Sequence, residues 1–335
     1  MEFSQDKKTM LSMIKPTGYF TLGNYIGALK NWVKLQEDYN SIFAVADLHA
    51  ITIRLEPKAL RQQTLTAYGI LHAIGLDPEK SIMFIQSTVP AHAELSWILS
   101  CYSMYGAMQR MTQFKDKSKK APENVNLGLF SYPSLMNADI LLYQADVVPV
   151  GVDQKQHVEL CRTVANRFNG IYGDTFKIPE PIIPKVGAKI MSLQNPLEKM
   201  GKSDTNENAS VKILDEPDVI MRKFKRAVTD SEAKIYFGDS QEKAGINNLM
   251  TIYSAVTGLS LEQIEKDFDG KGYGDFKVAV AEAVIEELRP VRERFNELMS
   301  DKGQLEAMYK NGAEQASYLA RKTLSKVKRK VGFVK

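Results

Sequence analysis

Two glycine-containing segments of this 335-residue chain have residue types that could handle phosphate. The first, residues 15–27, reads KPTGYFTLGNYIG, and its Gly23 and Asn24 precede apolar residues at helical spacing. We expect these two residues to open a helix, whose N-terminus offers free N–H groups and partial positive charge to an anion. Thr21 and Asn24 add polar side chains one turn apart. Taken alone, an ordinary capped helix start explains this segment more simply.

The second segment, residues 199–203, reads KMGKS. Its Lys199 and Lys202 stand three residues apart, in a polar stretch between two parts of the chain. Ammonium groups on a mobile loop could stabilise charge that develops on the bridging oxygen of a polyphosphate. Taken alone, a solvated linker is again the simpler explanation.

Several common catalytic motifs are absent from the sequence. There is no Gly-x-x-x-x-Gly-Lys-Ser/Thr loop, no Gly-x-Gly-x-x-Gly after the first strand, no His-Glu-x-x-His and no Gly-x-Ser-x-Gly. The four histidines stand singly and the two cysteines are 60 residues apart, which argues against a zinc site. No metal site made by the protein alone is therefore expected.

Basic residues gather at the C-terminal end, although the net charge is only +4. Residues 321–335 hold seven basic side chains and no acidic one. Such a tail could bind RNA phosphates, or it could be a helix end whose cations suit the helix dipole, and the sequence favours neither. No apolar stretch is long enough to cross a membrane, and the N-terminus has charges where a signal peptide needs an apolar segment. We expect a cytoplasmic protein.

Short apolar runs alternate with helix-period segments over the first two hundred residues. After a short apolar start at 10–14, the runs of strand character are 42–46, 81–85 and 147–150. In the last of them, Pro149 indicates the end of a strand. The segments of helical character include 57–75, 94–108 and 154–168. This alternation predicts the α/β class, with a Rossmann-like parallel sheet that binds ligands at the carboxyl ends of its strands.

The strand signals fade after about residue 204. Helices are expected at 219–228, after the capping box that begins at Ser260, at 276–299 with a kink at Pro290, and at 312–330. The sequence therefore predicts a catalytic domain over 1–203 and an all-α domain over 204–335. The last helix could pack back on the first domain.

The two phosphate segments together resemble the paired signatures of class I aminoacyl-tRNA synthetases, His-Ile-Gly-His and Lys-Met-Ser-Lys-Ser. The sequence around them is similar to the bacterial tryptophanyl-tRNA synthetases, over nearly the whole chain. The segments that carry this resemblance include DLHAIT (47–52), FIQS (84–87), VPAH (89–92), RMTQFK (110–115), ADILLY (138–143), VGVDQKQH (150–157), AVTDS (227–231) and GKGYG (270–274).

The resemblance implies that L-tryptophan reacts with ATP to give tryptophanyl-adenylate and pyrophosphate, and is then transferred to the 3′ end of tRNA(Trp). It assigns the ATP phosphates and ribose to Lys15, Pro16, Thr17, Gly23 and Asn24. It assigns the ribose and adenine site to Gly151, Val152, Asp153 and Ile190. The mobile loop over the pyrophosphate would be Lys199, Met200, Gly201, Lys202 and Ser203. Thr21, Asn24 and Lys115 would assist the two lysines in catalysis.

For tryptophan, the resemblance makes Asp139 the acceptor of the indole N–H. An indole has one donor and no acceptor, so a carboxylate is a suitable partner, and the ring needs apolar or aromatic walls. Gln154, Tyr132, His49 and Met136 would complete this pocket. The structural alternative for Asp139 is a carboxylate on an exposed helix surface.

The resemblance also implies a homodimer, with tRNA bridging its subunits and the anticodon read by the helical domain. Mg²⁺ would accompany ATP and rely on its phosphates. The chain departs from the family pattern at Gly201, where serine is common, and at Met13, where glycine is frequent.

Three other functions share part of this pattern. A tyrosyl-tRNA synthetase has the same fold, and only the family motifs argue against it. A small nucleotidyltransferase would not need the helical part. A non-catalytic RNA-binding relative would be expected to lose the lysines of the second segment.

Overall fold

The computed structural model describes residues 3–151, 154–183, 189–201 and 206–334. Its N-terminal part is built on a five-stranded parallel sheet with the order β3-β2-β1-β4-β5. The strands are β1 (Thr9–Ile14), β2 (Asn40–Val45), β3 (Ser81–Ile85), β4 (Val147–Pro149) and β5 (Glu180–Ile182). This is the doubly wound order, so the predicted Rossmann-like α/β class is confirmed.

Alternate side chains of the strands pack on two separate sets of helices. In β2, Phe43 and Val45 join the core on the side of α4 (Pro57–Ala73). Ile42 and Ala44 face the other core, with α5 (Ala91–Ser100), α8 (Leu127–Leu142) and α9 (Lys155–Tyr172). All six residues of β2 are buried. A strand buried on both faces has a nearly continuous apolar sequence, which is why this strand is predictable.

Five shorter helices complete this part of the chain. They are α1 (Leu22–Asn24), α2 (Lys30–Asp38), α3 (Asp47–Ala50), α6 (Tyr105–Gln109) and α7 (Thr112–Lys120). The prediction of one helix over residues 94–108 is wrong, because α5 and α6 are separate. The hydroxyls of Ser100 and Ser103 donate to the carbonyl oxygens of Ser96 and Leu99, at 2.8 and 2.9 Å. Serine bonds of this kind compete with the helix ladder and favour helix ends.

The chain beyond residue 206 is helical and forms no named strand as far as it is described, as predicted. Its helices are α10 (Pro217–Lys225), α11 (Ala244–Thr257), α12 (Leu261–Asp267), α13 (Tyr273–Ser300) and α14 (Lys302–Val331). Pro290 lies inside the continuous α13. Within the described ranges, no helix is long and apolar enough to span a membrane.

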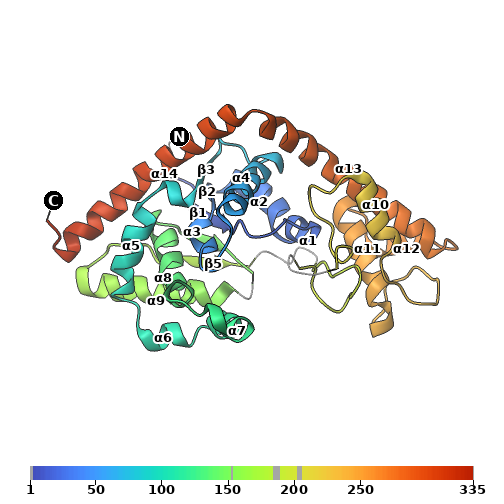
Figure 1. Cartoon of the computed structure of the whole chain (residues 1–335), viewed down its shortest axis with the longest axis horizontal. Helices are drawn as coiled ribbons and strands as arrows, with labels where there is room; N and C mark the ends of the chain where they lie inside the picture. The colour runs from blue at the N-terminus through green and yellow to red at the C-terminus, as the bar shows by residue number, and fades with distance from the viewer. Residues whose placement is uncertain (1–2, 152–153, 184–188, 202–205, 335) are drawn as a thin grey trace.

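The last helix, α14, runs back from the helical part along the sheet (Figure 1). It lies against the edge strand β3 so closely that a Cβ on Gly312 would be 1.7 Å from the carbonyl oxygen of Met83. Further along, the ammonium groups of Lys326 and Lys330 donate to the carbonyls of Thr175 and Tyr172. Part of the basic tail therefore holds this helix on the N-terminal part.

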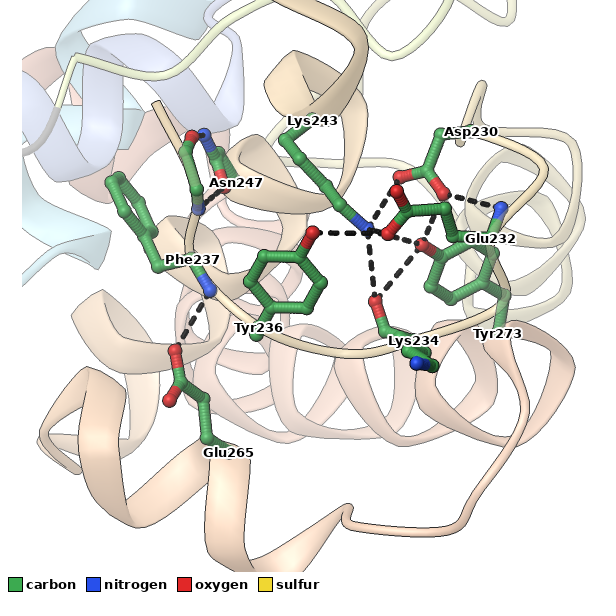
Figure 2. A network of polar contacts seen from close by, with 10 residues as sticks. Asp230, Glu232, Lys234, Tyr236, Phe237, Lys243, Asn247, Glu265 and Tyr273 are labelled. Carbon is green, nitrogen blue, oxygen red and sulfur yellow. Dashed lines mark hydrogen bonds and ion pairs between the residues drawn. The ribbon is translucent and has the colours of Figure 1, made fainter. Parts of the chain in front are cut away.

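A polar network around Lys243 fixes the loop between α10 and α11 (Figure 2). The nearly buried ammonium of Lys243 lies 2.8 Å from Glu232 and 3.3 Å from Asp230, and 4.0 Å from the ring centre of Tyr236. Tyr273 donates to Asp230 at 2.6 Å. Burial alone would lower the pKa of Lys243, but these partners raise it, so the lysine is charged. A buried charge needs such partners, and they hold the loop in place.

Candidate active site

A cavity of about 910 Å³ opens where the carboxyl ends of β1 and β4 meet. The strand order reverses between these two strands, and doubly wound sheets bind ligands at such a point. The structure brings together most of the predicted site residues here. Those that line the cavity are Lys15, Gly23, Asn24, His49, Tyr132, Met136, Asp139, Gly151, Gln154, Ile190 and Lys199.

Other predicted residues do not form the cavity wall. Those that are described but do not line it are Pro16, Thr17, Thr21, Lys115, Met200 and Gly201. Val152, Asp153, Lys202 and Ser203 lie outside the described residues. Met13, one of the two departures from the family pattern, does line the cavity, so its side chain forms part of that wall.

Thr21 and Asn24 form a reciprocal cap at the start of α1. The amide of Thr21 donates to Asn24 Oδ1 at 3.1 Å, and the amide of Asn24 donates to Thr21 Oγ1 at 3.3 Å. The cap uses the side-chain oxygen of Asn24, so its side-chain nitrogen is the donor that could meet a phosphate. After α1 the chain forms a π-helical turn, Tyr25–Leu29, a feature often found at functional sites.

Residues 191–193, which precede the lysine segment, are attached to the helical part through a buried side-chain amide. Asn248 of α11 donates to Met191 O at 2.9 Å and accepts from Met191 N at 2.8 Å. The backbone N–H of Val228 donates to Leu193 O at 2.8 Å. The chain is therefore fixed just before the lysine segment, and Lys199 lines the cavity. Nothing in the sequence singles out Asn248 for this contact.

Lysines supply positive charge among the residues that line the cavity. Lys15 lies 3.4 Å from the hydroxyl of Thr52, and burial, together with the charge of Lys117, lowers the pKa of Lys15 to about 8. Lys117 of α7 lines the cavity with its ammonium 4.5 Å from the ring centre of Tyr132. Lys115 stands two residues earlier, on a different side of the helix, and does not line the cavity. The sequence does not single out Lys117.

Asp139 is the one carboxylate among the described residues that line the cavity. Its side chain is only 2% exposed, so the alternative of a carboxylate on the helix surface is wrong. Oδ1 accepts from His92 Nδ1 at 2.6 Å and from Gln86 Nε2 at 2.7 Å, and Oδ2 accepts from His49 Nε2 at 2.7 Å. Burial would raise the pKa of Asp139, but the electrostatic and hydrogen-bonding effects of His49 and His92 outweigh it and lower the pKa to about 2.

Apolar and aromatic side chains surround this carboxylate. The hydroxyl of Tyr132 bonds to His157 Nε2 at 2.7 Å, and its ring meets the His49 ring edge-on, with the centres 6.2 Å apart. Met136, Ile140, Val148 and Val150 form much of the remaining wall. A buried carboxylate beside apolar and aromatic walls suits a flat ring that carries a single N–H.

The comparisons with known proteins agree with this geometry. Residues 4–289 match the family model described as tRNA synthetases class I (W and Y). The chain is 53% identical over 334 residues to a tryptophan--tRNA ligase of Clostridium tetani, covering all of this chain and 98% of that protein. It is 55% identical over 328 residues to one of Wolinella succinogenes, covering 98% and 99%.

Solved structures are similar over the same length. The tryptophanyl-tRNA synthetase of Mycoplasma pneumoniae gives a TM-score of 0.87 at 35% identity, with 98% of each chain covered. The Campylobacter jejuni enzyme, complexed with ADP and tryptophan, gives 0.86 at 32%, covering 97% of this chain and 100% of that one. A tyrosyl-tRNA synthetase of Aeropyrum pernix, at 21% identity and a TM-score of 0.64, shares the fold.

Proposed function

Because the chain belongs to the class I tRNA synthetases of the tryptophan and tyrosine group, we propose that the cavity between β1 and β4 is where it joins tryptophan to ATP. The chain charges tRNA with tryptophan, as its full-length relatives do. The buried carboxylate of Asp139, beside apolar and aromatic walls, is the observation that supports placing the indole here.

The first of the family's two steps, formation of the adenylate, then uses both ends of the cavity. At one end the indole N–H meets Asp139, with His49, Tyr132, Met136 and Gln154 around the ring. At the other end the nucleotide lies along the start of α1 and the lysine segment. The tryptophan carboxylate attacks the α-phosphorus, pyrophosphate leaves, and no covalent bond to the protein forms.

The chain contributes position and positive charge to this step. Lys15 and Lys199 line the nucleotide end, and Lys117 adds a third ammonium. Charges already in place stabilise the negative charge that moves to the leaving pyrophosphate. Among the residues that the structure describes, no carboxylate lines this end, and Mg²⁺ would enter with ATP and be held by phosphates and water.

Exchange of labelled pyrophosphate into ATP tests the assignment of substrate. We expect exchange with tryptophan and none above background with the other standard amino acids, because only an indole supplies a donor on a ring of this size. Tyrosine is the informative control, since its hydroxyl could also reach a carboxylate. Exchange with tyrosine as fast as with tryptophan would favour the tyrosyl alternative.

The pH dependence of ATP binding tests the role of Lys15. ATP should bind the protonated lysine, so KM for ATP should be flat below about pH 8, where Lys15 is charged, and should rise above it. Lys15→Arg carries a charge that does not titrate here, so its profile should be shallower. Lys117 remains in both proteins and accounts for any slope that persists. A wild-type profile that stays flat to pH 9.5 would exclude Lys15 from the phosphate site.

The family resemblance also supports a homodimer that binds tRNA through residues 204–335, in the cytoplasm. Apolar side chains crowd one region of the surface, where Asn126 donates to the carbonyl of Thr52 and joins two neighbouring segments. Those exposed there include Ile51, Val125 and Leu127. Burying such side chains against a second copy is favourable. Sedimentation velocity should give twice the 37.6 kDa chain mass, and a tRNA(Trp) anticodon stem-loop should bind to that species.

A further inference from the structure

We infer that His92, held by Tyr143, is a positioning residue that fixes the carboxylate of Asp139 for the indole. This inference rests on the proposed function, because it takes Asp139 as the acceptor of the indole N–H. Neither His92 nor Tyr143 lines the cavity, and both are buried. Their effect on tryptophan therefore has to pass through Asp139.

The two oxygens of Asp139 have different numbers of partners. A carboxylate oxygen offers about two lone-pair sites. Oδ1 receives both His92 Nδ1, at 2.6 Å, and Gln86 Nε2, at 2.7 Å, so its sites are filled. Oδ2 receives His49 Nε2 at 2.7 Å and keeps one site for another donor. The geometry therefore assigns the indole N–H to Oδ2, while the donors on Oδ1 set its direction.

Gln86 and His92 are themselves held in place. The side-chain oxygen of Gln86 accepts the backbone N–H of Leu48 at 3.1 Å, which turns the amide nitrogen toward Asp139. His92 Nε2 lies 2.8 Å from the hydroxyl of Tyr143. Each donor to Oδ1 thus has a second bond on its far side that fixes its orientation.

Tyr143 also determines which nitrogen of His92 carries the hydrogen. Burial, and then the negative charge of Asp139, raises the pKa of Tyr143 well above its usual value, so its hydroxyl is protonated. When that hydroxyl donates to Nε2, the ring hydrogen lies on Nδ1. Asp139 is ionised and can only accept, so this is the tautomer that it needs.

Two amide substitutions separate the two bonds of His92. In His92→Asn the side-chain nitrogen can take the place of Nδ1 and donate to Asp139, but it loses Tyr143. In His92→Gln the nitrogen can take the place of Nε2 and reach Tyr143, but Asp139 loses its donor. Both variants bury one neutral amide, so their folding costs are comparable. Tyr143→Phe removes only the hydroxyl.

Steady-state exchange kinetics should distinguish these variants. We expect His92→Gln to raise KM for tryptophan about tenfold, the effect of one lost hydrogen bond to a charged group, with KM for ATP unchanged. The preference for tryptophan over benzothienyl-alanine, which lacks the N–H, should fall with it. His92→Asn should keep most of the wild-type KM for tryptophan and most of the preference. Tyr143→Phe should give values between those of the two amide variants.

A purely structural role for His92 gives a different pattern. Both amide variants would then lose thermal stability alike and keep the wild-type preference, and that result would overturn the inference. If neither variant folds, Tyr143→Phe decides, and an unchanged preference in it overturns the inference. Asp139→Ala in the same assay separates the two claims. If it keeps the preference, the proposed indole site is wrong. If it alone loses the preference, only the role of His92 is wrong.

Discussion

Replacing both Lys199 and Lys202 with alanine should slow tryptophan-dependent pyrophosphate exchange more than any other change considered. Lys199 lines the nucleotide end of the cavity, and the family motif places Lys202 over the same pyrophosphate. Removing one preorganised charge of this kind typically costs about 10²–10³ in rate, so the pair should cost at least about 10³. The residues just before the segment are held by Asn248, whose side chain bonds to the backbone of Met191.

Folding and tryptophan affinity should therefore survive in this double variant. Thermal unfolding and equilibrium binding of tryptophan measure the two directly. Lys310→Ala is a matched control, because this lysine is exposed on α14, pairs with Glu306 and does not line the cavity. Exchange in the double variant within a few-fold of the control would remove the segment from the chemistry.

Replacing Asp139 with alanine should lower kcat/KM for tryptophan by at least about tenfold, with little change in KM for ATP. The wild-type site should reject benzothienyl-alanine, because an analogue without the N–H leaves a buried acceptor unpaired. The variant should lose most of that preference. Equal use of the two substrates by the wild type would contradict the assignment.

The ratio of kcat/KM for tryptophan to kcat/KM for benzothienyl-alanine is the preferred measurement for this variant. Asp139 accepts bonds from three side chains, so alanine leaves the donors of His49, Gln86 and His92 without their acceptor. Unpaired buried donors reduce stability as well as activity. A ratio of kcat/KM values does not depend on the fraction of folded protein, so it isolates recognition from folding.

The sequence predicts the fold and the place of the site because both follow from local patterns. β2 is apolar from Ile42 onward because both of its faces are buried, and the segment 15–27 follows directly after β1. β5 escapes prediction because Glu180 and Pro181 carry no apolar pattern. The separation of α5 from α6 depends on serine hydroxyls that also occur inside helices.

The sequence is least informative about contacts between residues distant in the chain. Gln86 and His92 lie in segments that carry the family resemblance, but their bonds to Asp139 join residues 53 and 47 positions apart. Lys117 lines the cavity and Lys115, two positions earlier on the same short helix, does not, which the motif alone does not predict. No local pattern marks Asn248, because its bonds to the backbone of Met191 form only in the folded chain.

The packing of α14 on β3 has a consequence for how the protein is made. β3 is an edge strand, and edge strands can pair with other chains unless something covers them. Gly312 is synthesised some 230 residues after Met83, which at typical rates of translation is roughly 10–50 s later. For that time β3 is without the helix that covers it. A chain shortened by losing α14 would thus be expected to aggregate before any defect in RNA binding could be observed.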